Sequence, residues 1–178
     1  MNKNKTARRY ISTEPPGSGP AVGERVDMTR YRDAQKETSL EGVAAGFEEI
    51  DHTADAALHL WAPDFEALLI QAARGAAWIM TDKMSSGPFP VRKHMALEAF
   101  DRESLLVAWL GELAYSAEAD RELFFSFEFN RVTDSRLIVD AEGIRVLALK
   151  TVIKAVTYHD LEIIETERGL EATVVLDV

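Results

Sequence analysis

The chain has 178 residues and no cysteine. Its length suits one domain with a sizeable core, and its composition excludes disulfides, thiolate metal ligands and thiol nucleophiles. Its formal net charge of −10 repels a phosphate backbone, so strong direct binding of RNA or DNA through a broad surface is not expected. Its longest apolar runs are well short of the roughly 20 residues that cross a bilayer, so no membrane partner is expected either.

Residues 1–45 mix Pro, Gly, Ser and charged residues without a sustained apolar period. This composition predicts a disordered or loosely attached N-terminal arm. The segment carries a net charge of +2, whereas residues 46–178 carry −12. Pro15, Pro16 and Gly17 stand where a signal peptide would need its apolar region, so a signal peptide is not predicted. The folded domain is expected to span residues 46–178.

Beyond this arm the chain shows the periodicity of regular secondary structure. Strands are predicted over 46–51 and 55–62, where apolar and polar residues alternate. Pro63 and Asp64 are typical of a helix start. Apolar residues at helical spacing then predict a helix over 65–80.

The second half of the chain contains one further helix and many strand-like segments. A strand is predicted over 91–100, and a helix begins at Asp101, a favourable N-cap residue. After this helix the sequence predicts strands in the segments 122–130, 136–143, 144–165 and 170–178. Strands interrupted by two helices predict an α+β domain, with a mixed or largely antiparallel sheet and both helices packed on one face.

The segment "DHTAD", residues 51–55, combines two carboxylates, a histidine and a threonine between two predicted strands. Asp and Thr side chains bond to their own backbone, so one interpretation is a simple turn. The alternative is a carboxylate site at a strand edge, formed by His52 and Asp55.

The segment "IKAVTYHD", residues 153–160, places Lys154 inside an apolar strand pattern. Such a lysine either protects a sheet edge from aggregation or holds its charge beside an anionic site or a partner. His159, taken alone, fits a structural role better than a metal ligand.

The chain ends in "VVLDV", so the carboxylate of Asp177 lies one residue from the terminal carboxylate of Val178. If this strand is docked, two anions lie side by side at its tip, and a bound cation or a lysine would relieve their repulsion. If the terminus is frayed, both anions are simply solvated.

Four segments stand in the order of the archease family: "HTAD", "ESLLVAWLGEL", "IKAVTYH" and a terminal Asp followed by an aliphatic residue. The region 46–178 therefore resembles that family. The resemblance implies a small cytoplasmic α+β protein that activates an RtcB-type, GTP-dependent RNA ligase in tRNA splicing and RNA repair. It implies that the protein promotes guanylylation and multiple turnover of the ligase and is not itself an enzyme.

The resemblance also implies a divalent cation, usually Ca²⁺, held by Asp55, Asp177 and the terminal carboxylate of Val178. Such oxygen donors suit Ca²⁺, Mg²⁺ or Mn²⁺. Three protein groups fall short of the roughly 6–8 oxygens that Ca²⁺ takes, so the site is expected to be open. The family's functional lysine falls on Lys154. His52 in "HTAD" and His159 in "IKAVTYH" are further candidates for contact with the partner.

Two other functions stay open at this stage. One is a metal-assisted hydrolase in which His52 is the general base beside Asp55 and the terminal carboxylates. The sequence shows no residue group that would recognise its phosphate or acyl substrate. The other is a calcium-binding, chaperone-like protein whose cation is structural.

Overall fold

The computed structural model describes residues 8–12, 45–51, 56–81 and 87–178. The elements follow one another in this order: β1 (Arg8–Ser12), β2 (Ala45–Asp51), β3 (Ala56–Ala62), α2 (Phe65–Met80), β4 (Val91–Glu98), α3 (Arg102–Ala119), β5 (Glu122–Val132), β6 (Arg136–Arg145), β7 (Ala155–Val156), β8 (Ile164–Thr166) and β9 (Gly169–Asp177).

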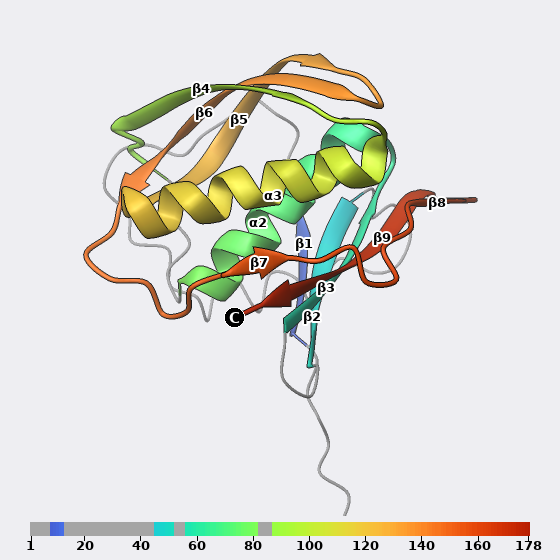
Figure 1. The fold of residues 1–178 in the computed structure, drawn as a ribbon, viewed down its shortest axis with the longest axis horizontal. Helices are drawn as coiled ribbons and strands as arrows, with labels where there is room; N and C mark the ends of the chain where they lie inside the picture. Colours follow the sequence, from blue (N-terminus) through green and yellow to red (C-terminus); the bar gives the residue numbers. More distant parts are fainter. Residues whose placement is uncertain (1–7, 13–44, 52–55, 82–86) are drawn as a thin grey trace, which may run out of the picture.

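Two antiparallel sheets enclose the helices (Figure 1). The larger sheet has the order β1-β2-β3-β9-β7, with β8 also paired to β9, and the smaller sheet has the order β4-β6-β5. Helix α2 contacts β2, β3 and β5, while α3 contacts β4, β5 and β7. The predicted α+β single domain is confirmed. The helices, however, are covered by a sheet on both sides, whereas the sequence indicated one sheet with helices on a single face.

Both helices begin where the sequence predicts, because their N-cap residues satisfy free backbone N–H groups. The Asp64 carboxylate accepts a hydrogen bond from the Ala67 N–H at 2.8 Å at the start of α2. At the start of α3, Asp101 accepts from the Ser104 N–H at 2.8 Å, and Ser104 Oγ accepts from the Asp101 N–H at 3.1 Å. This reciprocal pair is a capping box.

Trp109 of α3 lies at the centre of the core and is fully buried. Its indole N–H donates to the Leu69 carbonyl of α2 at 3.0 Å. Its ring meets Phe127 and Phe129 of β5 edge-on, with ring centroids 5.5 and 5.9 Å apart. Burial of such a ring with its N–H satisfied is strongly stabilising, so Trp109 links both helices to the smaller sheet.

The continuous strand pattern predicted over 144–165 is wrong for most of that segment. Strand β6 ends at Arg145, and regular pairing returns only at Ala155–Val156 and Ile164–Thr166. The intervening chain crosses from the smaller to the larger sheet, so it has no adjacent strand to pair with. It bonds instead to the end of α2, where the Lys150 N–H donates to the Met80 carbonyl at 2.9 Å.

Most of the predicted arm, residues 1–45, lies outside the described residues. The described parts of this arm are Arg8–Ser12 and Ala45, the first residue of β2; Arg8–Ser12 pairs antiparallel with β2, from Arg8 opposite Glu49 to Ser12 opposite Ala45. The boundary at residue 46 stays a prediction. Within the described ranges, no helix has the length and apolar character needed to cross a membrane.

Candidate functional site at the end of the chain

Strand β9 carries the end of the chain to the surface between β3 and β7. Leu176 is fully buried, and it lies opposite Ala56 of β3 and Val156 of β7. Asp177 is the last residue of the strand, and Val178 packs partly against the core. Because Leu176 anchors the strand, its tip is docked rather than frayed, and Figure 1 shows the chain end beside β7.

Lys154 contacts both of the last two residues. Its backbone N–H donates to the Asp177 carbonyl at 2.8 Å. Its ammonium donates to the main-chain oxygen of Val178 at 2.9 Å and lies 3.9 Å from Asp177 Oδ1. The structure therefore brings Lys154, Asp177 and Val178 together, although Lys154 precedes the chain end by more than twenty residues.

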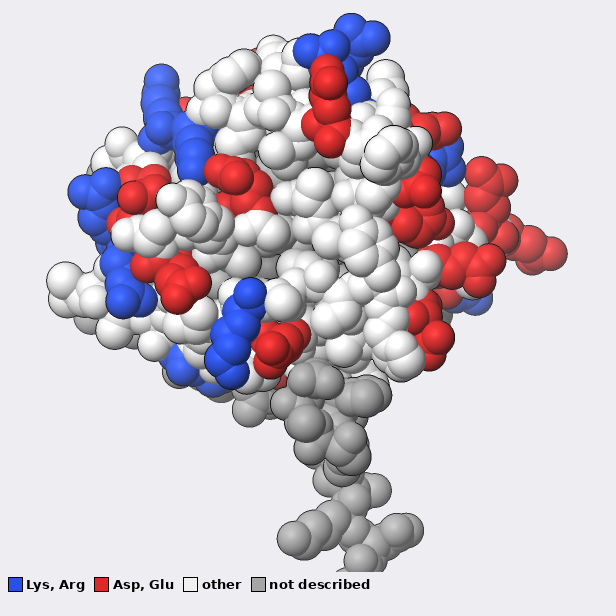
Figure 2. Space-filling model, in the orientation of Figure 1, with Lys and Arg blue, Asp and Glu red and all other residues white. Residues whose placement is uncertain are grey.

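This cluster is open to solvent. The side chains of Lys154 and Asp177 are 63% and 52% exposed. Figure 2 shows an uncharged area at the centre of this face, with acidic and basic side chains over the left end of α3 and beside β7, and acidic side chains gathered over β8 at the right. An open cluster beside an uncharged face suits contact with another macromolecule better than enclosure of a small substrate.

Asp55 and His52 lie outside the described residues. Strand β3 begins at the next residue, Ala56, which pairs with Leu176 directly before Asp177. In the described chain, Ala56, which follows "HTAD", thus lies beside Leu176, which precedes Asp177 and Val178. The hydrolase alternative depends on His52 and Asp55, so it stays a prediction.

His159 lies beyond the end of β7 and is 70% exposed. Its Nε2 atom is 3.4 Å from Asp160 Oδ2, and its backbone N–H donates to Thr157 Oγ1 at 3.3 Å. Among the described residues, the structure thus pairs this ring with its sequence neighbour Asp160 and not with Asp177.

The donor set at the chain end suits a hard divalent cation. Asp177 supplies carboxylate oxygens and Val178 supplies a main-chain oxygen in consecutive residues, and the Lys154 ammonium contacts both. Within the described part of the chain, no three His, Asp or Glu side chains converge on one point. A complete site therefore needs another donor.

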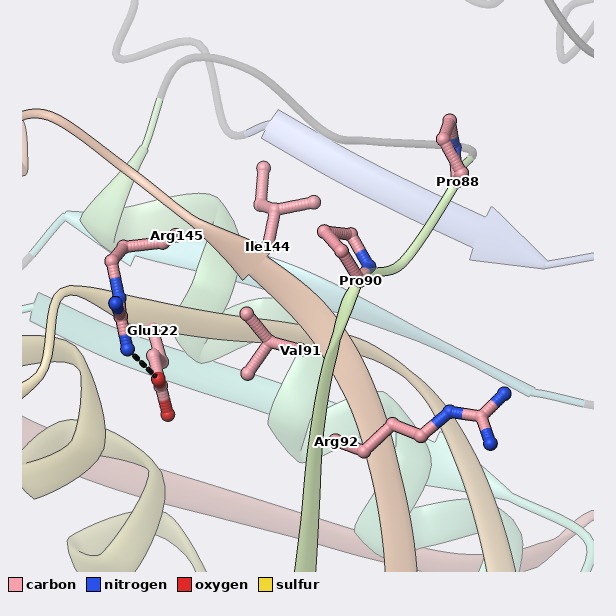
Figure 3. Close-up of a pocket in the computed structure, with 7 residues that line it drawn as sticks. All are labelled: Pro88, Pro90, Val91, Arg92, Glu122, Ile144 and Arg145. Carbon is pink, nitrogen blue, oxygen red and sulfur yellow. Dashed lines mark hydrogen bonds and ion pairs between the residues drawn. The ribbon is translucent and has the colours of Figure 1, made fainter.

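A separate open pocket of about 740 Å³ lies at one end of the smaller sheet (Figure 3). Its lining consists of Pro88, Pro90, Val91, Arg92, Glu122, Ile144 and Arg145. Arg145 donates to the Glu122 carboxylate at 2.6 Å, and Arg92 pairs with Glu142 at 3.0 Å. The charges are thus neutralised in pairs. This pocket could not be predicted from the sequence, because its residues come from three separate strands and a loop.

Comparison with known proteins points to one family. Residues 47–178 match the model of the Archease protein family (MTH1598/TM1083). The chain is 33% identical over 141 residues to Protein archease of Methanosarcina barkeri, a match that covers 74% of this chain and 95% of that protein. It is 34% identical over 137 residues to Protein archease of Saccharolobus solfataricus, with 74% and 98% covered.

Two solved structures share the fold. Protein 1598 of Methanobacterium thermoautotrophicum superposes with a TM-score of 0.59 at 29% identity, covering 74% of this chain and 98% of that one. An archease of Thermotoga maritima, described as a possible chaperone, superposes with a TM-score of 0.53 at 19% identity, covering 72% and 94%. At 19% identity, the similarity to the Thermotoga maritima structure supports a shared fold only.

Proposed function

The chain belongs to the archease family, and from this premise we propose that it is a non-catalytic protein cofactor of an RtcB-type, GTP-dependent RNA ligase. In this role it promotes guanylylation and multiple turnover of the ligase in tRNA splicing and RNA repair in the cytoplasm. The ligase joins the RNA, and this protein contacts the ligase.

The observation that carries this proposal is the convergence of Lys154, Asp177 and Val178 on an open surface. The sequence resemblance assigns functional roles to these three residues, and the fold brings them together across β7 and β9. A lysine beside two carboxylates, with both side chains more than half exposed, is accessible to the active centre of a docked enzyme.

The terminal carboxylates hold a divalent cation in this proposal. Asp55 is the third protein ligand, since it is bonded to Ala56, the residue opposite Leu176 in the strand ladder. Ca²⁺ suits these oxygen donors, and Mg²⁺ or Mn²⁺ are alternatives. When bound, the cation supplies a fixed positive charge whose remaining coordination positions are open to water or to oxygens of the ligase. His52 and His159 are proposed as further contacts with the ligase.

The test is multiple-turnover RNA joining. The protein alone is incubated with GTP and cleaved RNA, and then the ligase is added at a sub-stoichiometric level. We expect no joining by the protein alone, and turnover of the ligase only when both are present. Joining at the same rate with and without this protein would overturn the activator role.

Lys154→Ala tests the role of the site within the same experiment. The variant is expected to fold normally and to lose most of the stimulation, because the side chain is exposed and packs little. Lys150→Ala is the matched control, since it removes the same charge from an exposed position of the same segment. Equal stimulation by the two variants would remove Lys154 from the functional surface.

A chaperone-like role would give a different result. A protein that protects unfolded chains in general would suppress aggregation of unrelated proteins without the ligase. Such protection, together with no effect on ligase turnover, would replace the activator with the chaperone-like function.

A further inference from the structure

One edge of the larger sheet is covered by a strand from outside the shared domain. Strand β1 stands last in the strand order and pairs antiparallel with β2 (Figure 1). The family match begins at residue 47, and the match to the Methanosarcina barkeri protein covers 95% of that protein. Strand β1 is therefore an addition to the part that the family shares, and without it β2 would be the edge strand.

The register of this pairing sets opposite charges across from each other. Arg8 lies opposite Glu49, and Arg9 lies opposite Glu48. Opposite charges directly across two antiparallel strands favour pairing by about 1.4- to 5-fold for each pair, and like charges disfavour it by a similar factor. Tyr10 lies opposite Phe47, and aromatic residues in this relation also favour pairing. Three consecutive residues of β1 thus match their partners in β2.

The same two glutamates make the edge selective. If a second copy of β2 paired with this edge in full antiparallel overlap, Glu48 would lie opposite Glu48 of that copy, and like charges in this relation are destabilising. A segment with two adjacent basic residues meets no such repulsion. The edge of β2 therefore favours a basic strand over another copy of itself.

This edge is formed before any strand adds to it. Strand β2 pairs with β3 from Gly46 to Asp51, and Phe47 is fully buried in the core. The Trp78 indole N–H of α2 donates to the Glu49 carboxylate at 3.2 Å, which holds that carboxylate in place. A preformed edge with a positioned charge loses little conformational freedom when a strand binds.

We propose that the outer edge of β2 is a docking site for an extended basic segment, and that residues 8–12 are its built-in, exchangeable occupant. Main-chain hydrogen bonds supply the pairing, as in other cases of strand addition. Glu48 and Glu49 recognise two adjacent basic residues, and Phe47 recognises the aromatic residue that follows them. Because the occupant is covalently tied to the domain, its effective concentration exceeds that of the same segment free in solution.

Hydrogen exchange of the full-length chain tests the charge pairing. Arg9→Glu turns an opposite-charge pair into a like-charge pair, so exchange of the β2 amides that face β1 should become roughly 2- to 30-fold faster. Arg9→Glu combined with Glu48→Arg restores opposite charges and should return the exchange to within about threefold of the wild type. Arg30→Glu, the same change outside β1, is the control. Strand β9 is the internal reference, and its amides should stay protected in every variant.

A peptide supplied in solution tests whether the occupant is exchangeable. The synthetic peptide KTARRYISTE, which reproduces residues 5–14, is labelled and titrated with the Arg8→Glu/Arg9→Glu chain. We expect it to bind and to restore protection of β2. The wild-type chain should bind it at least about tenfold more weakly, because its own arm occupies the edge. A peptide with glutamate in place of both arginines is the matched control and should not bind.

Each result decides for or against this docking site. Unchanged exchange of β2 in Arg9→Glu would overturn it, as would faster exchange that Glu48→Arg does not reverse while β9 stays protected. If the doubly substituted chain also loses protection in β9, the peptide decides, and equal binding of the two peptides, or no binding of either, would overturn the proposal. Dimers of the Arg8→Glu/Arg9→Glu chain in light scattering would assign the edge to a second copy instead. None of these measurements involves the ligase or a cation, so their outcome is independent of the proposed function.

Discussion

Lys154 and Asp177 are joined twice, once through the backbone and once through their side chains. The backbone bond of 2.8 Å belongs to the pairing of β7 with β9, whereas the side chains approach only to 3.9 Å at the surface. The first link positions the chain end and does not depend on the lysine side chain. Substitutions of these side chains should therefore separate folding from function.

The carboxylate ligands give the first prediction. Asp177→Ala and Asp55→Ala should each lower the affinity for Ca²⁺ by more than about tenfold, because each removes an anionic oxygen donor. Calorimetry measures the affinity, and far-UV circular dichroism should stay unchanged because Asp177 is half exposed. Glu162→Ala, at an exposed position outside the cluster, is the control. Wild-type affinity in both aspartate variants would remove these residues from the site.

The chain terminus gives the second prediction. Adding two glycines after Val178 turns its carboxylate into a neutral amide and moves the charge outward by about 7 Å. The Ca²⁺ affinity should fall, whereas the melting temperature should change little, since an amide oxygen still accepts the bond from Lys154. The same two glycines added before Met1 serve as the control. If the C-terminal extension leaves the affinity as it was, Val178 is not a ligand.

Two glycines in different surroundings give the third prediction. A methyl group on Gly143 would lie 2.0 Å from the carbonyl oxygen of Leu123, whereas one on Gly111 in α3 would meet no heavy atom within 4 Å. Gly143→Ala should thus destabilise the fold by at least about 1–3 kcal/mol. Gly111→Ala should stabilise it by about 0.5–1 kcal/mol, because alanine suits a helix better. Urea denaturation measures both, and a destabilised Gly111→Ala would contradict the open helix face.

The cap of α3 gives a prediction of pH dependence. Hydrogen bonds from the Ser104 side chain and backbone N–H lower the pKa of Asp101 below its usual value. A lowered pKa in the folded state means that the ionised cap contributes stability above the unfolded pKa of about 3.9. This contribution is lost as the pH falls through the folded pKa.

Asp101→Asn keeps the capping geometry without the charge. The wild type should melt at a higher temperature than this variant near neutral pH, and the difference should shrink below about pH 4. A difference that stays constant between about pH 3 and pH 7 would show that the charge of Asp101 contributes nothing to the cap.

The sequence predicted the helix starts well, because a cap is a contact between residues three positions apart. Asp64 accepts a hydrogen bond from Ala67, and Asp101 accepts one from Ser104, so a short stretch of sequence contains both partners of each cap. The strand prediction over 144–165 was wrong for most of the segment. Alternation of apolar and polar residues reports side-chain burial, and it does not show whether a neighbouring strand is present to pair with. The chain there runs between the two sheets and bonds to Met80 of α2.

By itself the sequence determined what adjacent residues settle: the α+β class, the helix caps, and the adjacent positions of Asp177 and Val178. Only the tertiary structure decided that Lys154 lies against them, and that the helices are enclosed between two sheets. The physical reason is the sequence distance over which the interactions act. Caps and alternation arise from local hydrogen bonds and side-chain periodicity, whereas the approach of β7 to β9 depends on burying Ile153 and Leu176 in one shared core.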